Sequence, residues 1–231
     1  MAKIVNARGR SDGGSGYTRV LKNDKLGVLV SKVQATVISN GNELERLIMA
    51  RTNNIENLDD FIDKATIAEI TDGVYLCPKR IYAKSSYLIY DAQNNKIEPD
   101  LLIFIVEQRR ICKVVELKDG DSFDTKKSAG EKQHLEEFVL KFGSRIPFVA
   151  DYYICCFNQD NKELIYSGFK GAFDLSHILT GRELCEILKI DYDEIVEQRK
   201  VDADENFKYF LNQLLEIEEV NNYLTDKIIN Q

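Results

Sequence analysis

Two short runs of apolar residues stand close together near the middle of the chain. Residues 101–106 read Leu-Leu-Ile-Phe-Ile-Val, and residues 111–117 read Ile-Cys-Lys-Val-Val-Glu-Leu. Runs this short, rich in Ile and Val and bounded by turn-type segments, are typical of buried strands rather than helices. The polar residues 107–110 between them form a hairpin connection of ordinary length. The pattern therefore predicts an antiparallel pair of strands.

Charged residues stand at one end of this predicted hairpin. Pro99 and Asp100 precede the first strand, and Glu116 and Lys118 belong to the end of the second. Pro99 has no amide to donate, so it fits the first position of a strand and not the interior. The start of one strand lies opposite the end of the other, which places Asp100 near Glu116 and Lys118. Because side chains alternate faces along a strand, Glu116 and Lys118 project to one side and Leu117 to the other.

Two carboxylates beside an ammonium group favour hydrolysis of a phosphodiester. Mg²⁺ requires oxygen ligands and is usually held by one or two carboxylates together with substrate phosphate oxygens. Asp100 and Glu116 supply such a pair, and a bound cation polarises the phosphate and activates a water. Lys118 then positions that water or offsets the charge of the transition state. The simpler interpretation is a structural Asp–Lys ion pair, but the apolar strands on both sides favour a metal-dependent nuclease.

The sequence Pro99-Asp100, followed by Glu116-Leu117-Lys118, resembles the signature of the PD-(D/E)xK nuclease superfamily, which includes most type II restriction endonucleases. The resemblance implies that Asp100 and Glu116 bind Mg²⁺ and that the backbone carbonyl of Leu117 completes the coordination. It also implies that Lys118 helps to activate water. It extends more weakly over the common core of this superfamily.

The remaining pattern predicts an α/β domain. The expected elements are, in order, a helix after a break at residues 40–42, a helix over 58–68, extended segments over 73–90, the hairpin, a helix after Ser128, a strand over 148–157, a short strand over 164–166, a helix after Thr180 and a helical stretch over 205–229. The core order (helix, three strands, helix, strand) corresponds to a restriction-endonuclease-like αβββαβ core. We therefore expect a mixed central sheet flanked by helices, with an N-terminal arm and C-terminal helices.

Some members of the resembled superfamily place a further acidic residue on the first core helix, near the metal. Glu45 is the first candidate for this role, and Glu43 is the next. A solvated helix face is the alternative account of both residues.

We expect residues 1–40 to form a flexible basic arm and an entry segment that lead into a single nuclease domain over residues 41–231. The core of that domain is expected at about 42–157 and a C-terminal extension at 158–231. The division rests on length, because a chain of 231 residues can bury one sizeable core.

The arm is the first candidate for DNA contacts. Residues 6–19 are rich in Gly and basic side chains, so this segment should be flexible when unbound. Arg8, Arg10 and Arg19 are expected to meet phosphates or to enter the minor groove. A disordered leader with incidental charges is the alternative.

A second set of candidates follows the hairpin. Ser128 and Glu131 form a capping-box pattern that predicts a helix start. Lys126 and Lys127 precede this cap, close in sequence to the acidic cluster, and we expect phosphate contacts from them unless they are merely exposed loop charges. Gln133 falls on the first helical turn, where related nucleases often place a polar residue that faces the site.

The net charge of −7 argues against a protein whose whole surface binds nucleic acid. The charge is unevenly distributed, however: residues 1–32 carry a balance of +5, and residues 183–231 carry −8. Because phosphate contacts depend on local cations rather than on the global sum, a nuclease remains compatible with this composition.

Composition also predicts a cytoplasmic protein without a membrane span. No apolar stretch approaches membrane-spanning length, and the N-terminus lacks the apolar segment of a signal peptide. The five cysteines include no Cys-x-x-Cys pair and lie largely in apolar runs, which is typical of reduced core thiols. The same lack of ligand pairs argues against a zinc site.

The sequence thus predicts a type II restriction endonuclease that cleaves double-stranded DNA at a short specific sequence, using Mg²⁺ or, as a substitute, Mn²⁺. Cleavage of both strands at a symmetric site takes two active centres, so we expect a homodimer. The alternatives are a repair, nicking or junction-resolving nuclease of the same superfamily, a DNA-binding protein without catalysis, or an interaction protein in which the cluster is only an ion pair.

Overall fold

The computed structural model describes residues 1–9, 16–120 and 125–229, and the side chains of residues 125–127 lie outside this description. The chain divides into two compact units, the first made of Met1–Leu44 with Asp193–Gln231 and the second of Glu45–Tyr192. This division differs from the expected single domain over 41–231, because the residues from Asp193 onward group with the first 44 residues.

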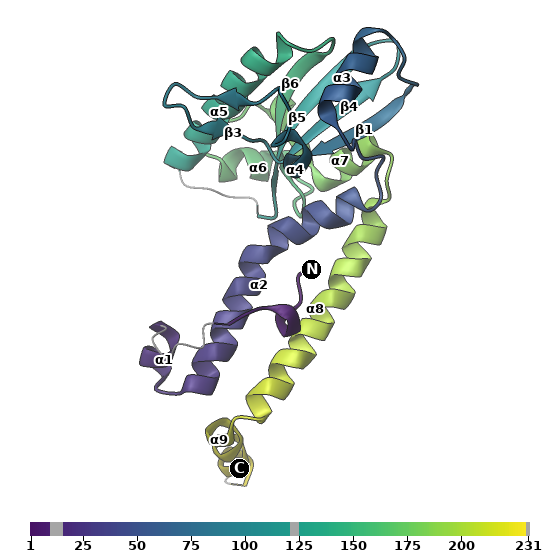
Figure 1. Cartoon of the computed structure of the whole chain (residues 1–231). Coiled ribbons are helices and arrows are strands. Elements are labelled where there is room, and N and C mark those ends of the chain that lie inside the picture. The colour runs from purple at the N-terminus through teal and green to yellow at the C-terminus, as the bar shows by residue number, and fades with distance from the viewer. Residues whose placement is uncertain (10–15, 121–124, 230–231) are drawn as a thin grey trace. The chain divides into compact units, whose positions relative to one another are not determined.

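A five-stranded mixed sheet forms the centre of the second unit (Figure 1). Its strands, in spatial order, are β1 (Gly73–Pro78), β4 (Leu101–Val106), β5 (Arg110–Lys118), β6 (Val149–Cys156) and β7 (Ile178–Thr180). The pairs β1–β4 and β4–β5 are antiparallel, whereas β5–β6 and β6–β7 are parallel. The hairpin predicted from the apolar pattern is confirmed, with Leu101 opposite Val115 and Val106 opposite Arg110.

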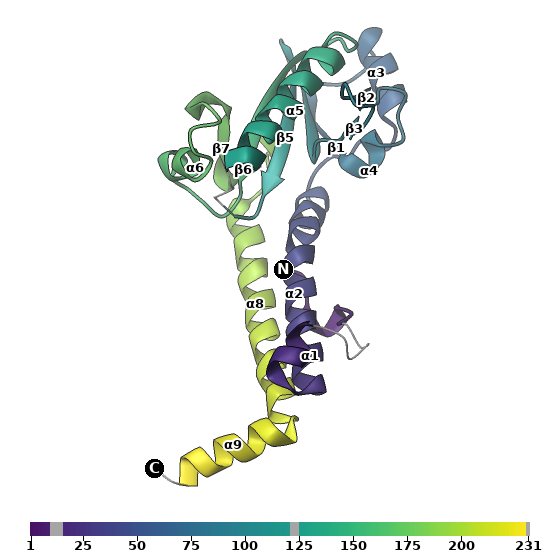
Figure 2. The ribbon, with the colours of Figure 1, turned by 90° about the vertical axis from the view of Figure 1, so that its left-hand side faces the viewer.

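Helices cover the sheet, which explains why strand β4 is apolar throughout. Helices α3 (Leu58–Thr66) and α5 (Thr125–Gly143) share one core with alternate residues of β4, and the ring of Phe104 lies 5.0 Å from that of Phe61. Figure 2 shows α5 running along the sheet beside β6. Helix α7 (Gly181–Leu188) packs against β1, β6 and β7. This is the mixed α/β architecture that the sequence predicts.

The connection between β1 and β4 differs from the extended segments expected over residues 73–90. After β1 the chain forms the short helix α4 (Lys79–Tyr82), and then β2 (Ile89–Tyr90) pairs with β3 (Lys96–Ile97) in a separate two-stranded sheet. The amide of Lys79 donates a hydrogen bond to the carbonyl of Asp100 at 3.1 Å. The start of α4 is therefore fixed beside the start of β4.

Two predicted element boundaries are wrong. Helix α2 (Asp24–Met49) runs through residues 40–42 without a break. Helix α5 begins at Thr125, so Ser128 is a buried residue within the helix and not its cap. By contrast, the capping box of Thr180 and Glu183 at the start of α7 is confirmed.

The short strand expected over residues 164–166 is also wrong, because helix α6 (Lys162–Gly168) occupies this segment. The side chain of Asn161 accepts hydrogen bonds from the amides of Glu163 and Leu164, at 2.9 and 3.3 Å. Such an N-cap satisfies orphan donors of the first helical turn and stabilises the helix.

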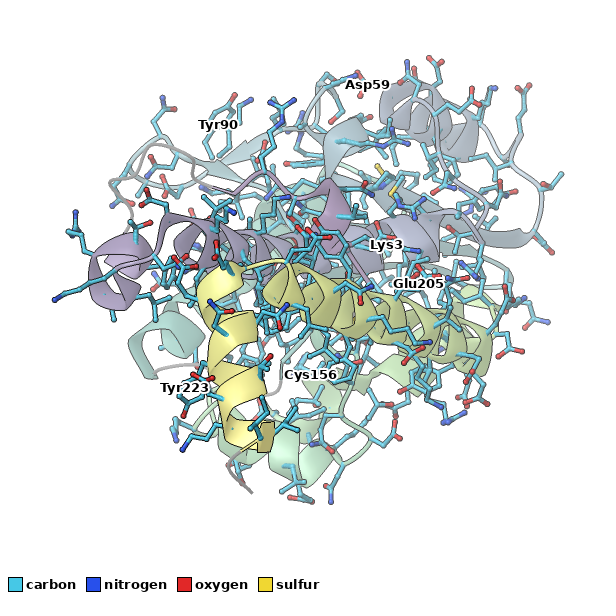
Figure 3. The ribbon with its side chains drawn as sticks, turned by 90° about the horizontal axis from the view of Figure 1, so that it is seen from below. Lys3, Asp59, Tyr90, Cys156, Glu205 and Tyr223 are labelled. Atoms are coloured by element: carbon cyan, nitrogen blue, oxygen red, sulfur yellow. The ribbon has the colours of Figure 1, made fainter. Side chains whose placement is uncertain are left out.

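The first unit contains α1 (Gly16–Leu21), most of α2, α8 (Tyr192–Leu215) and α9 (Glu218–Ile229). Residues at the N-terminus are tied to α8: Lys3 pairs with Glu205 (Figure 3) and lies 3.3 Å from Asp202, and the amide of Ile4 donates to Asn206 at 2.8 Å. The first residues of the chain are therefore anchored to α8, while residues 10–15 of the arm expected at 6–19 lie outside the described residues.

Within the described ranges, none of the helices combines the length and the apolar character needed to cross a bilayer. The five cysteines are buried, as the sequence predicts.

Candidate active site

Asp100 lies where β4 begins, next to the end of β5. Leu101 and Val115 form the last pair of the hairpin, so Asp100 and Glu116 occupy the position immediately beyond it. At that point the amide of Leu117 donates a hydrogen bond to Oδ2 of Asp100 at 2.9 Å. This bond holds the Asp100 carboxylate against the backbone of β5.

The carbonyl of Leu117 faces the same side as Asp100. In a β-sheet the N–H and C=O groups of one residue point toward the same neighbouring strand, and the Leu117 amide points to Asp100. The next carbonyl, that of Lys118, points the other way and accepts a hydrogen bond from the amide of Phe157 at 2.9 Å. The carboxylates of Asp100 and Glu116 and the Leu117 carbonyl therefore gather at one edge of the sheet.

This donor set suits a hard divalent cation. In the part of the chain that the structure describes, no three His, Cys, Asp or Glu side chains are arranged as a metal site. The oxygen ligands available at this edge are therefore the two carboxylates and the Leu117 carbonyl. Mg²⁺ keeps several waters and is usually bound through only one or two carboxylates plus substrate phosphate. The residues present fit such a cation.

Lys118 lies between two carboxylates. Its Nζ contacts Oε1 of Glu116 on the same strand and is 3.8 Å from Oε1 of Glu131 on α5. Residues i and i+2 of a strand share one face, which brings Glu116 and Lys118 together on the face that α5 covers. The Glu116 and Lys118 side chains are only 13% and 16% exposed, so their charges interact through partly desolvated surroundings.

Burial and crowded negative charge change the protonation of these groups. Burial, and then the charge of Asp100, raises the pKa of Glu116 well above its usual range, while Lys118 offsets part of the effect. Burial alone would lower the pKa of Lys118, but Glu116, Glu131 and Asp100 outweigh it and raise that pKa. Without a bound cation, burial and the neighbouring carboxylates therefore favour the protonated form of Glu116.

Glu45, at the C-terminal end of α2, belongs to the same electrostatic cluster. Burial and the charge of Asp100 raise its pKa to about 7, and the opposite charge of Lys79 lowers it in part. Burial is the larger of the two causes, and the contribution of Asp100 is an interaction between like charges. The charge of Glu45, the first of the two acidic candidates on this helix, is thus coupled to that of Asp100, and its part at the metal site stays a prediction.

A pocket with a volume of about 250 Å³ opens beside this cluster. The polar side chains that line it are those of Lys79, Lys96, Glu98, Glu116, Glu131 and His134. Lys79 lies 3.9 Å from Glu98, so a second cation faces the pocket from the start of α4. Its mixture of carboxylates and ammonium groups is suited to a phosphate accompanied by a metal ion.

No family model and no solved structure matches the chain. A curated protein does: "Type II restriction enzyme HhaII" of Haemophilus parahaemolyticus is 60% identical over 221 residues, which cover 95% of this chain and 96% of that protein. The chain belongs to the type II restriction enzymes. The family expected from Asp100, Glu116 and Lys118 is thereby confirmed.

The arginines predicted to bind DNA in this restriction enzyme lie in the first unit. Arg8 and Arg19 are exposed, and Arg19 is in the last turn of α1. Arg10 lies outside the described residues. Both described arginines are thus accessible to a large ligand.

The structure describes only one of the three side chains on α5 that were predicted to contact DNA, that of Gln133. Lys126 and Lys127 belong to the first turn of the helix, and their side chains lie outside the description. Gln133 is exposed, and the residues of α5 that line the pocket are Glu131, His134 and Leu135. The structure therefore does not bring Gln133 to the pocket wall.

Two charged residues of the site were missed by sequence reasoning. Glu131 was assigned to a capping box, yet it lies 3.8 Å from Lys118. Lys79 falls in the segment expected to be extended and was not singled out, yet it lines the pocket and lowers the pKa of Glu45 in part. Lys79 could not be found from the sequence, because only the pairing of β1 with β4 brings the segment after Pro78 to the start of β4.

Proposed function

We propose that this restriction enzyme hydrolyses phosphodiester bonds of double-stranded DNA at a short specific sequence, with Asp100, Glu116 and Lys118 as its catalytic residues and Mg²⁺ as its cofactor. One observation carries the proposal: Asp100 and Glu116 converge from the facing ends of two strands beside Lys118. The 60% identity to a type II restriction enzyme makes DNA the substrate to which this chemistry applies.

The carboxylates of Asp100 and Glu116 and the carbonyl of Leu117 would hold the cation. When bound, it polarises the scissile phosphate and lowers the pKa of a coordinated water. The crowding of carboxylates at this edge supports cation binding, since a cation takes the place of the proton that the raised pKa of Glu116 favours. Mn²⁺ suits the same oxygen ligands and is expected to substitute.

The chain's own groups position the reactants. The Lys118 ammonium donates to the attacking water or to a phosphate oxygen and offsets negative charge as it accumulates on the phosphate. Water forms a bond to phosphorus while the bond to the 3′ oxygen breaks, which leaves a 5′-phosphate and a 3′-hydroxyl. Glu45 adds a further carboxylate next to Asp100.

DNA contacts outside the catalytic cluster are proposed for the basic residues of the first unit and of α5. They are Arg8, Arg10, Arg19, Lys126 and Lys127 for phosphates, with Gln133 as a polar contact. Their local positive charge supports this role in a chain of net charge −7.

A homodimer acting in the cytoplasm completes the proposal, because each active centre then cleaves one strand. An exposed apolar stripe on α8 supports self-association: Phe207, Leu211 and Leu215 follow at four-residue spacing and are 61%, 41% and 51% exposed. Residues at this spacing share one helix face. Exposed apolar patches of this kind often mark interfaces between proteins.

Digestion of a supercoiled plasmid of known sequence with Mg²⁺, followed by mapping of the ends, tests the function. We expect discrete double-stranded fragments with 5′-phosphates, lost on addition of a chelator and in Asp100→Asn and Glu116→Gln. Glu69→Gln, an exposed acidic position, serves as the matched control and should cleave like the unchanged protein. Nicked circles alone, or cleavage that survives the chelator, would contradict the proposal.

A further inference from the structure

Two carboxylates, those of Glu116 and Glu131, lie next to Lys118. They belong to different elements and can therefore have different roles. Glu116 is on β5, next to Asp100, whereas Glu131 is on α5 and lies 3.8 Å from the same ammonium; both carboxylates line the pocket. The Glu131 side chain is 31% exposed, compared with 13% for Glu116. Lys118 thus has one buried partner and one partner nearer the solvent.

Glu116 is not able to serve Lys118 and a divalent cation equally well. A cation bound to the Glu116 carboxylate takes over its negative charge and repels the neighbouring ammonium, and this repulsion is strong in a partly desolvated pocket. Lys118 then requires another anion if it is to remain at the site. Glu131 Oε1, at 3.8 Å, is the carboxylate oxygen that already stands next to it.

We infer that Glu131 is a positioning residue, which receives the ammonium of Lys118 when a divalent cation occupies Glu116 and holds it at the reacting phosphate. The inference rests on the proposed function. It adds a residue of α5 to a site otherwise built from β4, β5 and the end of α2.

The position of Glu131 on α5 allows the Lys118 ammonium to move from Glu116 to Glu131. A charge-assisted N–H···O bond is about 2.7–2.9 Å long, so a movement of about 1 Å by the flexible lysine side chain brings it to Glu131. The helix itself is anchored, because Leu135 and Phe138 are buried in the core directly after Glu131. The carboxylate of Glu131 is therefore presented from a rigid element.

A double-mutant cycle separates this role from a merely structural one. In Glu131→Gln we expect kcat to fall about 10²-fold, the effect typical of misplacing a catalytic group by about 1 Å. DNA affinity measured with Ca²⁺, and KM, should change by less than about 2-fold. In a Lys118→Met background, Glu131→Gln should cause no further loss, because it acts through Lys118.

Glu137 supplies the matched control on the same helix. It forms a pair with Lys141 at 2.6 Å, so Glu137→Gln removes an equal charge from α5 away from Lys118 and should leave kcat unchanged. Thermal melting of all variants checks that they are folded. An equal loss from Glu131→Gln with and without Lys118, or an equal loss in Glu137→Gln, would overturn the inference.

Coordinates of the Ca²⁺-bound protein provide a readout independent of activity. We expect the Lys118 ammonium to lie within hydrogen-bond distance of Glu131 and to have left Glu116. If the protein cleaves no DNA, the proposed function fails. The coordinates would still show whether Lys118 moves from Glu116 to Glu131 when Ca²⁺ is bound. Lys118 remaining on Glu116 with Ca²⁺ bound, or no Ca²⁺ at Glu116, would overturn the inference.

Discussion

The amide of Leu117 donates a hydrogen bond to the carboxylate of Asp100 at 2.9 Å. The bond joins the end of β5 to the residue before β4, just beyond the last pair of the hairpin. It therefore holds the Asp100 side chain against the end of β5, next to the position of Glu116. One backbone amide thus links the strand register to the geometry of the proposed metal site.

This hydrogen bond gives Asp100 a structural role in addition to its proposed catalytic role. Two substitutions distinguish the two roles. Asp100→Asn keeps an oxygen that accepts from Leu117 but loses the negative charge, whereas Asp100→Ala loses both. We expect both variants to lower cleavage by about 10²-fold or more. Only Asp100→Ala should lower the free energy of unfolding substantially, by about 1–3 kcal/mol, because it leaves a buried donor without an acceptor. Urea denaturation provides the measurement, and equal stability of the two variants would contradict this assignment.

Glu45 should make the metal-free protein less stable as the pH rises. Its pKa in the folded protein is about 7, above the usual 4.5, so the folded state binds more protons than the unfolded state between these values and loses stability through that range. Glu45→Gln removes the effect. In a chelator-containing buffer, its melting temperature should exceed that of the unchanged protein at pH 8, and the difference should shrink toward pH 4.5.

The exposed control Glu69→Gln should show no such pH-dependent difference. A constant difference between Glu45→Gln and the unchanged protein at pH 8 and at pH 4.5 would show that Glu45 is not a desolvated carboxyl.

Cation binding should release protons near neutral pH. Burial and the charge of Asp100 raise the pKa values of Glu116 and Glu45, and a bound cation favours their ionised forms. The affinity for Mn²⁺ should therefore increase between pH 6 and pH 8. Isothermal titration calorimetry in two buffers of different ionisation enthalpy measures the protons released. An affinity that does not depend on pH would argue against binding at these carboxyls.

The apolar stripe on α8 should determine the oligomeric state. Leu211→Asp places a charge in the middle of the stripe and should convert a particle of twice the 26.5 kDa chain mass into one of that mass in light scattering. Leu140→Asp, at an exposed leucine of α5, is the matched control and should leave the mass unchanged. The Leu211→Asp protein should nick DNA rather than cut both strands. A dimer that persists in Leu211→Asp would place the interface elsewhere.

The parts of the fold that sequence reasoning predicted are those in which local pattern and tertiary packing agree. Strand β4 is buried along nearly its whole length, so its apolar run had one plausible interpretation, and its register with β5 followed from a hairpin of ordinary length. Asp100, Glu116 and Lys118 could be predicted because strand geometry alone brings them together. The capping box at Thr180 is likewise a purely local feature.

The wrong assignments concern segments whose local signals are weak. The Asn-Gly-Asn sequence at residues 40–42 disfavours a helix, but propensity is only a weak prior, and α2 continues through it to the buried residues Leu44, Leu47 and Ile48. The role of Glu131 was hidden for another reason. Its partner Lys118 is on a different element, and only the packing of α5 on the sheet brings them together.

The central claim is that Asp100 and Glu116 hold one divalent cation between them. Anomalous diffraction from crystals soaked in Mn²⁺ tests this most directly. We predict one Mn²⁺ within about 2–2.5 Å of a carboxylate oxygen of each residue, with the Leu117 carbonyl as a further ligand, and no Mn²⁺ at this position in Asp100→Asn. Mn²⁺ bound elsewhere, or contacting only one of the two carboxylates, would contradict the account.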